Sequence, residues 1–158
     1  MKNVEDVLYD GINYILCKLI KPNMEYSKVT EISSFEIDKL INYYNIKGII
    51  LDIDETIRFD MNDISIENEK WLDMITSKLK VIVLSNGIDY KIQNKLKQKN
   101  IEYIGNAFKP LKYNFLKACK ILDLNPYEVV VIGDDILCDI YGGKRNKMFT
   151  IKISDRYN

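Results

Sequence analysis

Three short apolar runs constrain the fold of this chain more than any other feature. They are rich in β-branched residues and cover Ile49 to Ile53, where Asp52 is the one polar residue, Val81 to Leu84, and Val129 to Ile132. None alternates between apolar and polar positions, as a strand with one solvated face does. Such runs are typical of strands buried on both faces of a parallel sheet. The sequence therefore predicts a sheet covered by helices on both sides.

Helical periodicity fills the segments between these runs. Apolar residues recur there every three or four positions, which places them on one face of a helix. A weaker strand is predicted over Tyr103 to Ala107, and Met148 to Ile153 alternates like an edge strand that closes the sheet. Strand and helix in alternation predict a doubly wound α/β fold with a mostly parallel, five-stranded sheet and right-handed crossovers. The three helical stripes are Leu72, Ile75 and Leu79; Ile88, Ile92 and Leu96; and Leu111, Phe115, Ala118, Cys119 and Leu122.

The N-terminal region precedes this alternating unit. An amphipathic helix is predicted from Val4 to Leu19, stopped near Lys21-Pro22, and a second helix starts at a capping box formed by Ser33 and Glu36. A length of 158 residues suits one globular domain. We therefore expect a helical extension over residues 1–24 and an α/β domain over residues 25–158.

Composition excludes several classes of function. The chain has no histidine, and Cys17, Cys119 and Cys138 form no CxxC pair, which disfavours a structural zinc site and any Ser-His or Cys-His nucleophile. The net charge is zero and no basic run is long, so nucleic acid is not expected as a partner. The acidic start of the chain fits neither a secretory signal nor a mitochondrial transit peptide, which predicts a cytoplasmic protein.

Polar residues follow four of the predicted strands. In open α/β sheets the ligand lies outside the carboxyl ends of the strands, so these residues are expected to converge at one rim. Crowded carboxylates repel one another, and a hard cation such as Mg²⁺ is their natural counter-ion. The groups are Asp52 with Asp54, Ser85-Asn86-Gly87, Lys109-Pro110, and Asp134-Asp135 with Asp139.

These residue types suit phosphoryl transfer. A carboxylate can attack phosphorus, so Asp52 is the candidate nucleophile, and Asp54, two residues on, can handle the proton of the leaving group. Lys109 and Mg²⁺ would neutralise charge on the phosphoryl oxygens, while Ser85 would hold their geometry. Asp135 is expected to be a capping or solvent-facing residue.

The same residues resemble four motifs of the haloacid dehalogenase (HAD) superfamily. Residues 51–56, LDIDET, are similar to the first motif, DxDxT, and Leu84-Ser85-Asn86 to the second. Lys109-Pro110 is similar to the third motif, and residues 133–139 to the fourth, GDxxxxD. The resemblance implies a phosphatase that works through an aspartyl-phosphate.

The resemblance also implies a role for each site residue. Asp52 would be the nucleophile, Asp54 the general acid and base, and Thr56 a support for the loop. Mg²⁺ would be held by Asp52, the backbone carbonyl of Asp54, and Asp134, with Asp139 binding in its outer shell or orienting a water. The expected phosphate and substrate contacts are Thr56, Asn86, Gly87, Arg58 and Arg145.

Two gaps in the motif pattern predict that no cap domain is present. Only 28 residues separate Thr56 from Ser85, and 23 separate Ser85 from Lys109. One helix and its connections fill each gap. An uncapped site favours a bulky substrate, either a lipid head group or a phosphorylated macromolecule.

Within the superfamily the chain resembles the subfamily IIIA proteins related to phosphatidylglycerophosphate phosphatase. Trp71-Leu72 and residues 139–146, DIYGGKRN, carry this likeness, with departures at Lys144 and Glu55, where asparagine is usual. This resemblance implies an anionic phospholipid substrate. The amphipathic segment from Val4 to Leu19 could then lie against a membrane interface. Packing of that helix on the domain or in a dimer is an equal alternative, and the oligomeric state stays open.

Two other functions stay open from the sequence. The DxDET form that Glu55 creates is similar to that of capless phosphatases acting on phosphoserine. A non-enzymatic phosphate-binding scaffold with the same fold is the other alternative.

Overall fold

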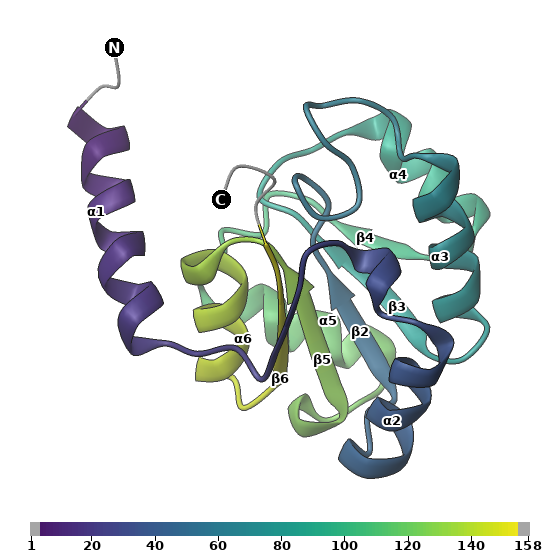
Figure 1. The fold of residues 1–158 in the computed structure, drawn as a ribbon. Coiled ribbons are helices and arrows are strands. Elements are labelled where there is room, and N and C mark those ends of the chain that lie inside the picture. Colours follow the sequence, from purple (N-terminus) through teal and green to yellow (C-terminus); the bar gives the residue numbers. More distant parts are fainter. Residues whose placement is uncertain (1–3, 155–158) are drawn as a thin grey trace.

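A single parallel sheet forms the centre of the molecule (Figure 1). The computed structural model describes residues 4–154, apart from the side chains of Asp6, Asn13 and Cys17. The six strands run in the order β1-β6-β5-β2-β3-β4, and every neighbouring pair is parallel. Their bounds are β1 Met24–Tyr26, β2 Gly48–Leu51, β3 Lys80–Leu84, β4 Glu102–Ile104, β5 Val129–Gly133 and β6 Phe149–Ile153.

Helices cover both faces of this sheet. Buried residues of α2, α3 and α4 pack against one face, and buried residues of α5 against the other. Successive residues of β2 show why both faces need cover, since Ile49 and Leu51 join the first cluster and Ile50 the second. The helices are α1 Val4–Leu19, α2 Ser34–Tyr44, α3 Ile66–Thr76, α4 Tyr90–Gln98, α5 Lys112–Leu122 and α6 Gly142–Arg145, with the short turns η1 Val29–Glu31, η2 Pro126–Glu128 and the π-helical η3 Ile136–Tyr141.

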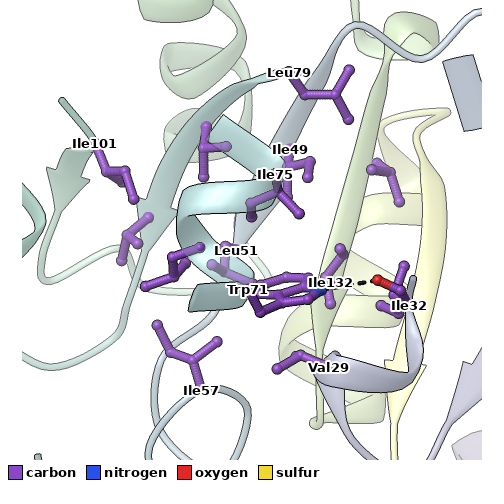
Figure 2. Packing of buried hydrophobic residues seen from close by; sticks show 14 of the residues in the cluster. Val29, Ile32, Ile49, Leu51, Ile57, Trp71, Ile75, Leu79, Ile101 and Ile132 are labelled. Atoms are coloured by element: carbon purple, nitrogen blue, oxygen red, sulfur yellow. Dashed lines mark hydrogen bonds between the residues drawn. The ribbon is translucent and has the colours of Figure 1, made fainter. Parts of the chain in front are cut away.

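Trp71 of α3 ties the segment before α2 to the sheet. Its indole ring lies in the larger apolar cluster, and its Nε1 donates a hydrogen bond to the carbonyl of Ile32 at 3.0 Å (Figure 2). Ser33 then caps α2 by accepting a hydrogen bond from the backbone N–H of Glu36. The predicted N-cap is therefore confirmed, but the reciprocal half of the capping box is not formed, because the N–H of Ser33 donates to the carbonyl of Glu31 at 2.9 Å.

The doubly wound α/β prediction is confirmed, but the predicted number of strands is wrong. The sheet has six strands, because residues 24–26 pair with residues 151–153 of β6. A strand of three half-exposed residues carries too little pattern to be recognised, and the expected boundary at residue 24/25 falls inside it. The Met148–Ile153 segment is consequently an interior strand and not an edge.

One predicted helix also begins later than expected. Asp89 caps α4, because its side chain accepts hydrogen bonds from the backbone N–H groups of Lys91 and Ile92. Ile88 therefore precedes the helix and is exposed. Ser85 is left in the loop that follows β3.

The strand order fixes where a ligand can bind. The chain leaves β2 toward β3 on one side, while β5 lies on the other side of β2. Ligands bind in open α/β sheets at such a switch point, outside the carboxyl ends of the strands. The residues that follow β2 and β5 are Asp52 and Asp134, so two of the predicted carboxylates lie at this position.

The connections leave this rim uncapped. A loop and α3 link β2 to β3, and α4 links β3 to β4, so no cap domain is inserted among the described elements. Within residues 4–154, no helix is both long and apolar enough to cross a membrane.

Candidate active site

A tight turn after β2 places the first carboxylate. Asp52 extends the sheet ladder by donating its N–H to the carbonyl of Ile132 at 2.9 Å. The carbonyl of Ile53 then accepts hydrogen bonds from the N–H groups of residues 56–58. This turn brings the hydroxyl of Thr56 back over Asp52, where its Oγ1 donates to Oδ2 at 3.2 Å. The same hydroxyl lies 3.4 Å from Asp134 Oδ1.

Lys109 holds the centre of the site together. Its Nζ lies 2.6 Å from Asp52 Oδ1 and 2.6 Å from Asp139 Oδ1, and all three side chains are buried. The loop after β4 thereby meets both the loop after β2 and the η3 turn. The structure thus brings together Asp52, Lys109, Asp134 and Asp139, which the sequence predicted to converge, and places Thr56 beside them.

Burial and charge act in opposite directions on these groups. Burial alone would lower the pKa of Lys109, but the carboxylates of Asp139 and Asp52 outweigh it and raise the pKa above its ordinary value. The ammonium is therefore charged. Complete burial raises the pKa of Asp139, and neighbouring Asp52 raises it further, against the opposing effect of Lys109.

Gly133 is required by the close approach of Asp139. A Cβ at position 133 would lie 2.3 Å from Cγ of Asp139, so any other residue would displace the carboxylate. Asp139 is further held by the backbone N–H of Asp135, which donates to Oδ2 at 3.1 Å. The glycine of the GDxxxxD motif is therefore required here for steric reasons.

The donor set of the site fits a divalent metal ion. One carboxylate oxygen each from Asp52, Asp134 and Asp139 lie within 4.8 Å of one another. Three acidic side chains surround the single ammonium of Lys109 in a mostly buried site, so acidic groups outnumber the basic one. Oxygen donors of this kind are those that Mg²⁺ uses, commonly together with retained waters. Asp52, Asp134 and Asp139 are accordingly the side chains that would hold it.

Asp54 is held by a buried arginine and is not part of that cluster. Arg58 Nε donates to Asp54 Oδ1 at 2.7 Å, and its Nη1 donates to Asp89 Oδ2 at 2.5 Å. The guanidinium is 4% exposed, while the Asp54 side chain is 44% exposed. Burial would lower the pKa of Arg58, but its hydrogen bonds with both carboxylates raise it overall. Arg58, predicted as a substrate contact, is thus occupied by two ion pairs.

The loop after β3 is tied to the lysine loop. Asn86 Oδ1 accepts a hydrogen bond from the backbone N–H of Lys109 at 2.7 Å. Ser85 is buried, and its Oγ accepts a hydrogen bond from the N–H of Gly87 at 3.2 Å. The Asn86 contact therefore joins the second motif loop to the third, while the Ser85 contact lies within the second loop.

Arg145 lies at the surface beside these loops. Its guanidinium stacks on the ring of Tyr141, with 5.5 Å between the guanidinium carbon and the ring centroid, and Nη1 donates to the carbonyl of Pro110 at 3.4 Å. The structure therefore places Arg145 next to the lysine loop, and no described contact joins it to the carboxylate cluster.

Two residues near the site were missed by sequence reasoning. Asp89 pairs with Arg58. The only sequence feature that pointed to Asp89 was its position before a helical pattern. Tyr9 of α1 donates to Asp135 Oδ2 at 2.5 Å and lies 3.6 Å from Cys138 Sγ. Burial raises the pKa of Cys138 to about 12, with Asp135 contributing. Nothing in the sequence links Tyr9 to residues more than 120 positions away.

Asp135 itself has the predicted capping role. Its Oδ1 accepts hydrogen bonds from the N–H groups of Leu137 and Cys138 at the start of η3. Cys119 and Cys138 are free thiols, while the Cys17 side chain lies outside the described residues.

Comparison with known proteins agrees with this geometry. A family model described as "Hydrolase: haloacid dehalogenase-like hydrolase" matches residues 68–146, which is half of the chain. The chain is also 32% identical over 111 residues to "Probable phosphatase YqeG" of Bacillus subtilis (strain 168), a match that covers 69% of this chain and 64% of that protein.

Solved structures share the fold. An uncharacterized protein from Listeria monocytogenes serotype 4b has a TM-score of 0.57 at 17% identity, covering 72% of this chain and 84% of that one. A HAD phosphatase from Thermococcus onnurineus has a TM-score of 0.51 at 22% identity, covering 61% and 49%. The parallel sheet and the residues at its rim define the α/β fold of HAD-like hydrolases. This chain belongs to the haloacid dehalogenase-like hydrolase family.

The excess negative charge of the site makes metal binding measurable without catalysis. We expect Mg²⁺ to raise the melting temperature of EDTA-treated protein, since a ligand at 100 times its Kd adds about 2.7 kcal/mol to the free energy of unfolding. Asp134→Asn should reduce the shift, because it removes one charged ligand. Asp63→Asn is the matched control, since Asp63 pairs with Lys91 and Lys95 on the surface. Equal shifts in wild type and Asp134→Asn would place the ion elsewhere.

Proposed function

We propose that this protein is a Mg²⁺-dependent phosphomonoester phosphatase that works through an aspartyl-phosphate on Asp52. The observation that carries the proposal is the pair of contacts on the Asp52 carboxylate, from Lys109 Nζ at 2.6 Å and Thr56 Oγ1 at 3.2 Å. They orient a carboxylate at the switch point of the sheet, beside two further carboxylates. The likeness to a probable phosphatase supports the same reaction.

The reaction has two steps. A carboxylate oxygen of Asp52 attacks phosphorus, the bond from phosphorus to the leaving oxygen breaks, and Asp54 gives that oxygen a proton. Asp54 then takes a proton from a water that attacks the same phosphorus. The phosphoryl bond to Asp52 breaks, phosphate leaves, and the carboxylate is restored. A bound Mg²⁺ would supply charge neutralisation for the phosphoryl oxygens.

Lys109 positions Asp52, and Arg58 positions Asp54. The ammonium of Lys109 is buried between carboxylates, so it orients Asp52. It also offers positive charge to a phosphoryl oxygen in a site that is largely shielded from water. Arg58 holds the half-exposed carboxyl of Asp54, and Asp89 holds Arg58 in turn. Proton transfer in this scheme requires Asp54 to exchange the Arg58 contact for one with the substrate.

Asp52→Asn tests the nucleophile. The amide keeps the shape and can still contact Lys109 and Thr56, but it lacks the attacking charge. We expect Mg²⁺-dependent hydrolysis of an aryl phosphate to fall by at least about a thousandfold, with a far-ultraviolet circular dichroism spectrum like that of wild type. Asp63→Asn, in the same loop, should keep its activity. A loss of less than tenfold in Asp52→Asn would contradict the mechanism.

Asp54→Asn should affect the two steps unequally. An activated aryl leaving group needs little protonation, whereas hydrolysis of the aspartyl-phosphate needs a base to activate water. The phosphoenzyme should therefore accumulate, which acid quenching and intact-protein mass spectrometry can detect as an added phosphoryl group. If the variant holds no more phosphoenzyme than wild type, Asp54 does not act as the base.

For the substrate we propose a bulky phosphoester, with the head group of a phosphatidylglycerophosphate-like anionic lipid as first choice. Support comes from the uncapped rim and from the subfamily IIIA resemblance of Trp71-Leu72 and residues 139–146. Phosphopeptides are the alternative, which the DxDET form created by Glu55 suggested. A structural role of Glu55 weakens that support. Its backbone is left-handed (φ 59°), and its Oε1 accepts a hydrogen bond from the N–H of Asp60 at 3.0 Å.

A substrate panel decides between these classes. We expect kcat/KM for phosphatidylglycerophosphate in mixed micelles to exceed that for small sugar phosphates, because without a cap the substrate's own bulk must exclude water from the site. A soluble glycerophosphate that shares the head group but lacks the acyl chains is the matched control. A sugar phosphate or phosphopeptide turned over as efficiently as the lipid would overturn this choice and leave the phosphatase proposal standing.

A further inference from the structure

Helix α1 presents its apolar side to solvent. The residues Val4, Leu8, Ile12, Ile15 and Leu19, called here the α1 stripe, are between 41% and 85% exposed. Their spacing of three or four places them on one face of the helix. The side that meets the domain is a different one, where Tyr9 donates a hydrogen bond to Asp135. A stripe of this length on the outside of a folded domain requires an explanation.

The α1 stripe is symmetric about the middle of the helix. The midpoint of residues 4–19 lies between Gly11 and Ile12. In an antiparallel pair of α1 helices related by a two-fold axis at this point, Val4 lies level with the partner's Leu19, and Leu8 lies level with the partner's Ile15. Four of the five stripe residues therefore map onto each other, and Ile12 lies level with the partner's Gly11. A two-fold interface needs this property, since the same patch must serve both copies.

The glycine at the midpoint supports a helix crossing there. Glycine in a helix interior costs about 1 kcal/mol relative to alanine. A Cβ at Gly11 would have no atom within 4 Å, so nothing in the described part of the chain requires glycine at this position. The backbone of a second helix passing over Gly11 would require it, because small residues let two helices approach closely.

The charges of α1 favour a second copy over an anionic membrane. The acidic residues Glu5, Asp6 and Asp10 lie in the first half of the helix, and Lys18 lies in the second. An antiparallel pair sets the acidic half of each helix beside the basic end of the other. Helices that bind anionic lipid surfaces are instead rich in lysine and arginine on their polar face, and α1 carries three acidic residues against one basic residue.

We propose that α1 is a homodimerisation helix, and that two copies of this chain associate through an antiparallel, two-fold contact of their α1 stripes. The proposal rests on the residues of α1 and does not require the proposed phosphatase reaction. A single pair of 16-residue helices forms a small interface, so the dimer should dissociate on dilution.

Sedimentation velocity over a roughly hundredfold range of concentration tests the proposal, and we expect the wild type to shift from dimer to monomer on dilution. Leu8→Lys should be monomeric throughout, because the two-fold axis sets one lysine against each partner's Ile15. Ile66→Lys, an equally drastic change at an exposed residue of α3, is the matched control and should dimerise like wild type. Gly11→Leu should weaken the dimer while leaving circular dichroism helicity at or above wild type.

Two results would overturn the proposal: a wild type that is monomeric at every concentration, or Leu8→Lys and wild-type proteins with the same dimer affinity. Flotation with phosphatidylglycerol vesicles distinguishes the membrane alternative. If the lipid surface is the occupant, Glu5→Lys should bind vesicles more strongly than wild type, and monomeric wild-type protein should float. Vesicle binding that requires the stripe, in a protein that shows no dimer, would assign the helix to the membrane.

Discussion

The buried ammonium of Lys109 is the interaction on which the site depends. It lies 2.6 Å from carboxylates that arrive on two separate segments, the loop after β2 and the η3 turn after β5. Without it, Asp52 and Asp139 would face each other at the switch point with uncompensated charge, which costs several kcal/mol in a buried environment. The lysine loop after β4 therefore keeps loops from distant parts of the sequence at one rim.

The rest of the local structure serves this arrangement. Asn86 fixes the lysine loop through the N–H of Lys109, and the Ile53 turn returns Thr56 to Asp52. Gly133 leaves room for the Asp139 carboxylate. The remaining negative charge is concentrated where Asp134 joins the cluster, so the features that position the residues also make the site attractive to a cation. Structural and chemical roles of these residues coincide.

The sequence predicted most of this site because its residues follow strands. Three apolar runs located the central strands, and the carboxyl ends of parallel strands share one edge, so Asp52, Lys109 and Asp134 could be placed together without coordinates. Side-chain direction could not be predicted in the same way. Asp54 was placed as an acid beside the nucleophile, but its contact with Arg58 depends on where the chain turns after Glu55, a residue with a left-handed backbone that no periodicity reveals.

Two further misses share a physical origin, since both depend on contacts between segments distant in sequence. β1 has three residues and exists because β6 offers it a partner. Tyr9 of α1 contacts Asp135 only because the chain folds back on itself, since 126 positions separate the two residues. That contact gives α1 a link to the site, because the same Asp135 caps η3 through its side chain and donates its N–H to Asp139. A partner docked on the outer side of α1 would restrain the contact between this helix and Asp135, the capping residue of η3. It would thereby also restrain the turn that carries the Asp139 carboxylate to Lys109.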